Sequence, residues 1–342
     1  MSSINIPDEI LKGFPEARDC ANKIIMLAVA KDGSPQQLRR VLDSNTEVKL
    51  DEINDHANRN LLYYAAQGNS EEKVRLLLDR GVKPAPQPFD EPMQSPLFPA
   101  IETGNKNVVQ LLMDNGASIE IRSREEESQP PRTALTVAVE KGHDELVEML
   151  LANGLDPHNT TNSTNVALYH AVDTCNLPVL TRLLDLGFDA DTTVPDMVWY
   201  GDATLLSAAA ERCASTNPSG CEGIIKFLLE RGADPNSNTG VNEMPPISPV
   251  AEANRAGAVK LLLDHGASPT RMDGDGMCAF WRAAEKDCVD VVRIFLDYAV
   301  EKEWDDCYLR VPMSGAELYD ARGVLKLLKE HEERYPSCMG CE

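Results

Sequence analysis

The sequence predicts an all-α protein in which one helix–turn–helix unit is repeated along nearly the whole chain. The first observation is that similar segments recur, such as "PLFPAIETGNKNVVQLLMDNG" at 96–116 and "ALTVAVEKGHDELVEMLLANG" at 134–154. The second is the spacing of a Leu-containing triplet, which begins at residues 40, 76, 111, 149, 182, 227, 261, 294 and 326. Composition is the third, because 42% hydrophobic and only 5% aromatic residues are typical of small packed helices.

The sequence pattern of each unit predicts two helices. Leu97, Ala100, Ile101 and Gly104 follow the i, i+3, i+4, i+7 pattern of one helical face, and the small residues permit close packing. A longer apolar stripe from 108 to 113 gives the second helix, and Gly116 suits the left-handed residue after its end. Two such helices cannot bury a core alone, so the units must stack.

The spacing and the residues resemble the ankyrin repeat. The successive triplets lie 32 to 45 residues apart, close to the 33-residue ankyrin period, and the best matches to its signature are "SPLFPA" at 95–100 and "RGADPN" at 231–236. The resemblance implies an α-solenoid of about nine stacked repeats with β-hairpin finger loops. The chain departs from the family at the His that follows the signature Leu, which is replaced in each clear copy. The replacements are Tyr63, Phe98, Thr136, Tyr169, Ser207, Ser248 and Trp281.

The repeats divide the chain into three parts. We expect an N-terminal segment at 1–21, the repeat region at 22–330 and a flexible tail at 331–342. The most divergent units, at 22–55 and 308–330, are expected to be caps whose outer faces meet water. The fifth clear unit carries an inserted loop, "ASTNPSGC", at 214–221. Four loops between units are long enough to form fingers: 83–94, 120–131, 190–203 and 237–246.

The composition limits the classes of partner. A formal charge of −22 repels nucleic acids and anionic membranes and attracts basic proteins. Neither a signal peptide nor an apolar membrane span is recognisable, so we expect a monomeric protein of the cytoplasm or the nucleus. The nine scattered cysteines indicate reduced thiols, and the lone CMGC at 338–341 is at most half a zinc site. We therefore expect no metal and no cofactor.

One position of the repeat carries an acid in six successive units. It is the residue just after the small pair that ends the first helix. The six acids are Glu102, Glu140, Asp173, Glu211, Glu252 and Glu285. We call them the inner acids, and the ankyrin resemblance places them on the concave side. A second row, the outer acids, follows the triplets: Asp79, Asp114, Asp185, Glu230, Asp264 and Asp297. Because two faces are equally acidic, the inner acids are either a binding feature or solvated decoration of a duplicated unit.

Aromatic residues near the inner acids favour the interpretation that these acids are a binding feature. The residue four before an inner acid is its neighbour on the helix, and this pairs Phe98 with Glu102, Tyr169 with Asp173 and Trp281 with Glu285. An aromatic face beside a carboxylate suits a Lys or Arg side chain. Trp199 and Tyr200, in the finger "DMVWYGD", are further candidates for partner contact.

We predict a non-catalytic module that binds a basic or amphipathic protein segment through the inner acids together with Tyr169, Trp199, Tyr200 and Trp281. The sequence contains no nucleophile elbow, phosphate loop, dinucleotide fingerprint or HExxH, which favours a non-catalytic module over an enzyme. Two alternatives stay open. One is an enzyme acting on a small cationic substrate with Tyr169, His170, Asp173 and Glu211 as acid–base groups. The other is a passive scaffold.

Overall fold

The structure is a computed structural model of all 342 residues. It describes residues 15–46, 48–84, 95–119, 122–123, 132–155, 161–195, 202–215, 218–238, 243–304 and 309–335. The chain divides into two compact units, residues 1–164 and 165–342, which are described separately below.

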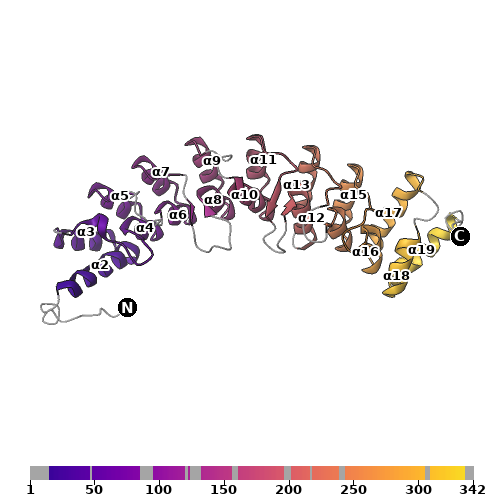
Figure 1. The fold of residues 1–342 in the computed structure, drawn as a ribbon, viewed down its shortest axis with the longest axis horizontal. Coiled ribbons are helices and arrows are strands. Elements are labelled where there is room, and N and C mark those ends of the chain that lie inside the picture. The colour runs from indigo at the N-terminus through magenta and orange to yellow at the C-terminus, as the bar shows by residue number, and fades with distance from the viewer. Residues whose placement is uncertain are drawn as a thin grey trace. The chain divides into compact units, whose positions relative to one another are not determined.

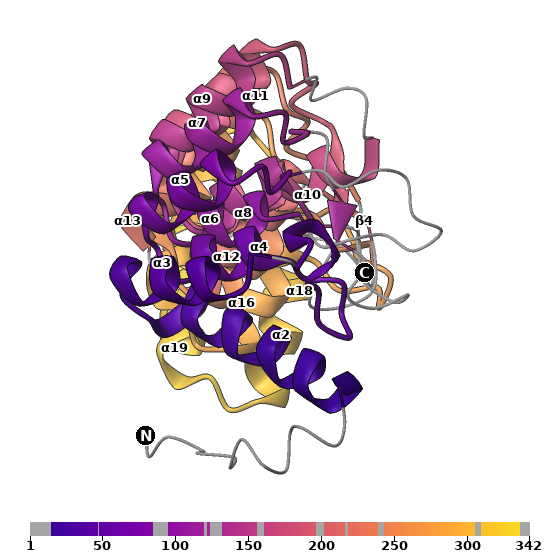
Figure 2. The ribbon, with the colours of Figure 1, turned by 90° about the vertical axis from the view of Figure 1, so that its left-hand side faces the viewer.

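The first unit is built from helical pairs (Figure 1). Its elements are α2 (Pro15–Asp32), α3 (Pro35–Ser44), the 3-10 turn η1 (Leu50–Glu52), α4 (Leu61–Gln67), α5 (Glu71–Asp79), α6 (Leu97–Glu102), α7 (Lys106–Asp114), β1 (Arg122–Ser123), β2 (Arg132–Thr133), α8 (Ala134–Glu140) and α9 (Asp144–Ala152). First helices contact first helices, as α4 does α6, and second helices contact second helices, as α5 does α7. The row of α5, α7 and α9 is visible in Figure 2.

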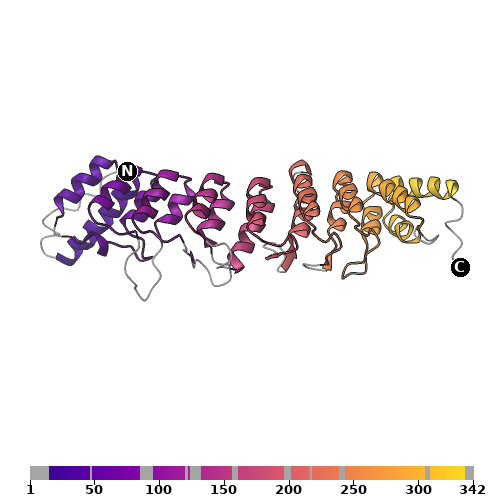
Figure 3. The ribbon, with the colours of Figure 1, turned by 90° about the horizontal axis from the view of Figure 1, so that it is seen from above.

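The second unit repeats this plan. Its elements are α10 (Thr161–Asp173, which begins just before the boundary), α11 (Leu177–Asp185), β3 (Thr193–Pro195), β4 (Asp202–Thr204), α12 (Leu205–Ser215), α13 (Pro218–Glu230), α14 (Ile247–Glu252), α15 (Ala256–Asp264), α16 (Ala279–Glu285), α17 (Val289–Glu301), α18 (Arg310–Leu318) and α19 (Arg322–Arg334). Figure 3 shows its successive helical hairpins, from pink to yellow. The expected all-α repeat fold is confirmed.

Local sequence explains the start and end of these helices. The second helices α5, α7 and α11 are preceded by the N-cap residues Ser70, Asn105 and Asn176, whose side chains accept hydrogen bonds from backbone N–H groups of the first turn. Helix α7 ends at Asp114, and Gly116 follows it in the expected left-handed conformation, with a φ of +90°. The next N–H, of Ala117, donates to the Leu112 carbonyl at 2.9 Å.

The core of each unit consists of the apolar faces of stacked helices. In α6, Leu97, Ala100 and Ile101 are fully buried, as the periodicity predicts. Neighbouring repeats are also joined by polar contacts: the His143 ring lies 3.3 Å from the Glu102 carbonyl oxygen. A Cβ on Gly104 would come within 2.7 Å of that ring, so the glycine permits this contact.

Where the family's His is missing, hydroxyl pairs take over part of the hydrogen bonding. Thr136 Oγ1 accepts from the Thr133 N–H at 2.8 Å, and Thr133 Oγ1 accepts from the Thr136 N–H at 3.2 Å, which closes a capping box. Ser207 and Thr204 form the same kind of pair, with their hydroxyls 3.0 Å apart. These hydroxyl pairs therefore supply local hydrogen bonds in two of the repeats that lack the family's His.

Two of the expected loops form short hairpins. Strands β1 and β2 pair antiparallel through two residues each, and β3 and β4 through three, with Val194 opposite Ala203. The first helices α8 and α12 start directly after β2 and β4. Each hairpin therefore projects from the side of the repeat at which the first helix begins.

The repeat boundaries differ from the sequence expectation at three points. The segment 214–221, expected to be a loop, is largely helical, because α12 continues to Ser215 and α13 begins at Pro218. Helix α2 begins at Pro15, before residue 22, and α19 continues to Arg334, past residue 330. His331 is buried in α19, so packing against the last repeat extends this helix.

Candidate functional site

The inner acids lie at equivalent places in the two units. Glu102 and Glu140 are the last residues of α6 and α8 in the first unit. In the second unit Asp173, Glu252 and Glu285 are the last residues of α10, α14 and α16. Glu211 lies within α12 instead, because the inserted residues lengthen that helix by about one turn.

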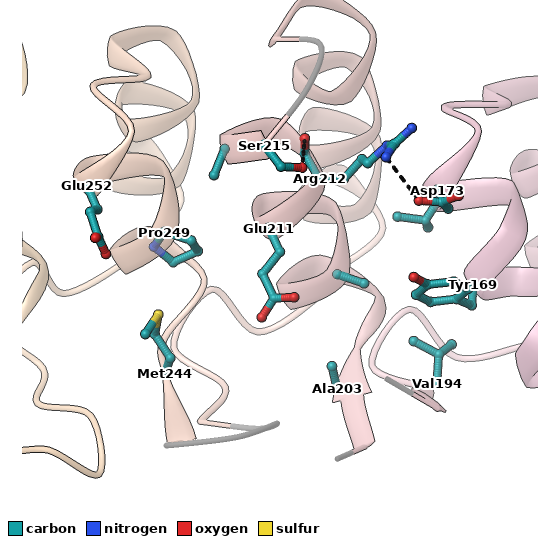
Figure 4. A pocket seen from close by; sticks show the side chains of 13 residues that line it. Tyr169, Asp173, Val194, Ala203, Glu211, Arg212, Ser215, Met244, Pro249 and Glu252 are labelled. Atoms are coloured by element: carbon teal, nitrogen blue, oxygen red, sulfur yellow. Dashed lines mark hydrogen bonds and ion pairs between the residues drawn. The ribbon is translucent and has the colours of Figure 1, made fainter. Parts of the chain in front are cut away.

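Three of the four inner acids of the second unit line one cavity of about 480 Å³. Asp173, Glu211 and Glu252 come from α10, α12 and α14, three successive first helices. The remaining lining is mostly apolar: Val172, Val194, Ala203, Ala208, Ala214, Met244 and Pro249, together with Tyr169, Arg212 and Ser215. Figure 4 shows the Glu211 carboxylate extending from α12 to a position between Met244 and Ala203, and the Tyr169 hydroxyl pointing from α10 toward α12.

The cavity contains more negative than positive charge. Its cationic lining group is Arg212, whose Nη1 lies 3.3 Å from Asp173 Oδ1 on the preceding repeat (Figure 4). The two side chains are 35% and 37% exposed, so water screens this pair and its contribution to stability is small. With three carboxylates and one guanidinium among the lining residues, the cavity has a formal charge of −2.

Basic residues bridge the inner acids of the next repeats. Lys286 Nζ lies 3.5 Å from Glu252 and 3.6 Å from Glu285. Arg282 lies 3.7 Å from Glu252 and donates two hydrogen bonds to Asp273, whose side chain is fully buried. In the first unit, Lys141 pairs with Glu140 at 2.9 Å. In each unit, inner acids are therefore paired with basic residues.

The aromatic candidates fall into different environments. Tyr169 is half-buried and lines the cavity. Trp281 packs edge-on against Tyr319, with ring centroids 5.8 Å apart, and a Cβ on Gly315 would lie 3.1 Å from its indole. Phe98 is 8% exposed. Trp281 and Phe98 therefore contribute to packing, whereas Tyr169 presents a face to the cavity.

Some of the remaining candidate residues line the cavity and others do not. Tyr169, Asp173 and Glu211, three groups of the enzyme alternative, line one cavity, but His170 is not among its lining residues and instead contacts the Tyr169 ring edge-on at 5.7 Å. Glu211 is exposed. Trp199 and Tyr200 lie outside the described residues.

Several residues that line this cavity were not predicted from the sequence. Met244 lies within the fourth predicted finger and Pro249 just after it, and Val194 and Ala203 face each other in the paired strands of the third. Arg212 follows Glu211 in sequence, but its side chain pairs with Asp173, the acid of the preceding repeat. The helical spacing of α12 was the available signal, because Ala208, Glu211 and Ser215 are three and four residues apart and share one helical face.

The described ranges contain neither a candidate metal site nor a candidate membrane-spanning helix. No group of three or more His, Cys, Asp or Glu residues there is arranged to hold a metal ion. Among the same residues, every helix is too short or too polar to cross a bilayer.

Comparison with known families gives a match over most of the chain. The family described as ankyrin repeats, in three copies, matches residues 25–123, 122–196 and 206–306. These ranges include the residues that line the cavity, with the exception of Ala203.

Individual relatives are more distant. An ankyrin repeat protein of Acanthamoeba polyphaga mimivirus is 28% identical over 127 residues, which cover 37% of this chain and 74% of the viral protein. The B-cell lymphoma 3 protein homolog of Mus musculus is 26% identical over 54% of this chain and 37% of its own length. The E3 ubiquitin-protein ligase KEG of Arabidopsis thaliana is 24% identical over 79% of this chain, but only 16% of the ligase is covered.

Proposed function

The chain belongs to the ankyrin-repeat family, whose repeats generally serve protein interaction, and from this premise we propose that it binds a basic protein segment through the cavity between α10, α12 and α14. The proposed ligand is an extended or helical segment that carries Lys or Arg side chains beside apolar ones. The observation that carries the proposal is the convergence of Asp173, Glu211 and Glu252 around an apolar cavity with one guanidinium.

The cavity suits the two parts of such a ligand. Val194, Ala203, Met244 and Pro249 offer apolar surface to a ligand's side-chain stems, and the carboxylates lie around it for the charged ends. Tyr169 adds an aromatic face, which attracts a cation within about 6 Å of the ring centre. The net charge of −22 would also speed the encounter with a basic partner.

Local stability does not account for the inner acids. A negative charge at a helix C-terminus is opposed by the helix dipole, at a cost of about 0.3–1 kcal/mol. Nevertheless, α10, α14 and α16 all end in a carboxylate. A role in binding gives a reason for tolerating that cost in successive repeats.

The test is a pair of matched charge reversals. The cavity variant is Glu211→Lys with Glu252→Lys, and the control is Glu230→Lys with Asp264→Lys in the outer acids of the same unit. Both change the net charge equally, so a difference reports the position of the charge. We expect the cavity variant to bind a labelled oligolysine peptide on the order of tenfold more weakly, and the control less than twofold. Equal losses in the two variants would show attraction by net charge alone and would overturn the proposal.

A further inference from the structure

Two cysteines of the second unit lie in direct contact beside the cavity. Cys175 Sγ and Cys221 Sγ are 2.8 Å apart, although 46 residues separate them in sequence. Cys175 occupies the turn between α10 and α11, two residues after Asp173, and Cys221 lies in the first turns of α13. The contact therefore joins two successive repeats.

Cys175 has a backbone conformation that other residue types adopt at the equivalent turns of the other repeats. Its φ is +53°, in the left-handed region. The equivalent turn residues are likewise left-handed, and all are Gly, Asn or Asp: Asn69, Gly104, Gly142, Asn254, Asp287 and Asp320. Those three residue types tolerate this region best, so a cysteine is the less favourable choice for the backbone. Backbone stability alone does not explain Cys175.

Cys221 lies in a second departure from the repeat pattern, the inserted segment 214–221. It is the last residue of the segment inserted into the fifth unit. A Cβ on Gly220 would lie 3.3 Å from the Cys175 Cβ, so the glycine permits α13 to approach the turn this closely. The unusual turn residue and the inserted segment thus meet at the two sulfur atoms.

We propose that Cys175 and Cys221 form a reversible disulfide, a redox-sensitive bond that ties the α10–α11 turn to α13. The sulfurs need to approach by less than about 1 Å to reach bonding distance. The oxidant is hydrogen peroxide. The Cys175 thiolate attacks the peroxide oxygen and becomes a sulfenic acid with release of water; the Cys221 sulfur then displaces the hydroxyl as a second water and closes the S–S bond. Two thiols and one hydrogen peroxide give one disulfide and two waters.

The different burial of the two cysteine side chains indicates which thiol reacts first. Among the five cysteines whose side chains the structure describes, Cys175 is half-buried, and Cys213, Cys221, Cys278 and Cys288 are buried. Burial raises the pKa of the Cys221 thiol, as does its hydrogen bond with Cys175. Cys175 is therefore the thiol that a peroxide reaches first, and Cys221 is the resolving thiol. This inference does not depend on the proposed binding function, although the bond would fasten one wall of the cavity.

The experiment uses the full chain with Cys338→Ser and Cys341→Ser, because the CMGC pair could itself oxidise. The reduced protein is treated with hydrogen peroxide and digested without reductant, and the linked peptides are identified by mass spectrometry. We expect Cys175 linked to Cys221, reversal by dithiothreitol, and a rise of the thermal unfolding midpoint on the order of 5 °C on oxidation.

Two variants supply the controls. Cys175→Asn introduces the residue found at the equivalent turns of 69 and 254, so it should fold and lose both the link and the rise in unfolding temperature. Cys221→Ser is a second variant with the same expected result, and Cys278→Ser should retain both effects. Oxidation of Cys175 without a link, or a link from Cys175 to Cys213, would overturn the proposal.

Discussion

The second unit presents two rows of acids that carry the same charge but have different surroundings. The inner acids Asp173, Glu211 and Glu252 lie around a cavity with apolar walls. The outer acids Asp185, Glu230 and Asp264 end the second helices α11, α13 and α15, Asp297 lies within α17, and all four are exposed. None of these four lines the cavity, although Asp297 lines a much smaller pocket of about 50 Å³ between α17 and α19. The difference teaches that charge pattern alone does not define a site, whereas charge beside shaped apolar surface can.

The ion pairs of the two rows also differ in burial. Arg282 links Glu252 to Asp273, whose side chain is fully buried, whereas Arg231 pairs at 2.7 Å with Asp185, whose side chain is 49% exposed. The inner network is thus anchored in the repeat structure, and the outer pair lies on its surface.

The largest expected effect is on stability. Arg282→Ala leaves the Asp273 carboxylate with backbone partners but without its cation, and should lower the free energy of unfolding by about 3 kcal/mol. The matched outer variant, Arg231→Ala, should cost less than about 1 kcal/mol, because water solvates Asp185. Urea unfolding followed by circular dichroism measures both. Similar losses would show that burial does not distinguish the two pairs.

The second effect is a gain in binding. Arg212→Gln removes the guanidinium among the cavity-lining residues and frees Asp173 for a ligand cation. Affinity for the labelled oligolysine peptide should rise about fivefold, which corresponds to about 1 kcal/mol. Arg231→Gln makes the same change in net charge beside the outer acids and should leave the affinity within twofold. Fluorescence anisotropy at fixed ionic strength measures this, and equal gains would contradict the account.

The aromatic contribution is smaller. Tyr169→Leu keeps an apolar side chain in the cavity but removes the face that attracts a cation, and should weaken peptide binding about threefold. Tyr298→Leu is the control, because Tyr298 already has Lys302 Nζ over its ring at 5.5 Å and lies on α17, away from the cavity. An unchanged affinity in Tyr169→Leu would leave the carboxylates as the sole determinants.

The smallest effect concerns the turn beside the cavity. Under reducing conditions Cys175→Asn should raise the free energy of unfolding by roughly 0.5 kcal/mol, because Asn adopts the left-handed region more readily. Asn254→Cys makes the reverse change at the equivalent turn and should lower it by a similar amount. Thermal unfolding in the presence of reductant measures the pair, and a large loss in Cys175→Asn would mean that the thiol itself stabilises the turn.

The repeat fold could be predicted from sequence because it depends on local periodicity. The spacing of Leu97, Ala100 and Ile101 and the glycine at 116 specify a helix and its neighbour's end within about twenty residues. The inserted segment was harder, because "ASTNPSGC" contains loop-forming residues, yet tertiary packing extends helices into it from both sides.

The cavity could be predicted only in part. Its carboxylates and Tyr169 were found because they recur at fixed positions of the repeat. Met244 and Val194 come from loops of irregular length, so periodicity does not place them. The pairing of Arg212 with Asp173, and the contact of Cys175 with Cys221, join different repeats and depend on how the helices stack.

The most direct test of the account is to map where a basic ligand contacts the protein. Backbone hydrogen–deuterium exchange followed by mass spectrometry, with and without the oligolysine peptide, compares the two rows of acids in one experiment. The account predicts slower exchange at the C-terminal ends of α10, α12 and α14, around residues 169–176, 208–215 and 249–255. Protection confined to the ends of α11, α13 and α15, around residues 185–187, 230–232 and 264–266, would contradict it.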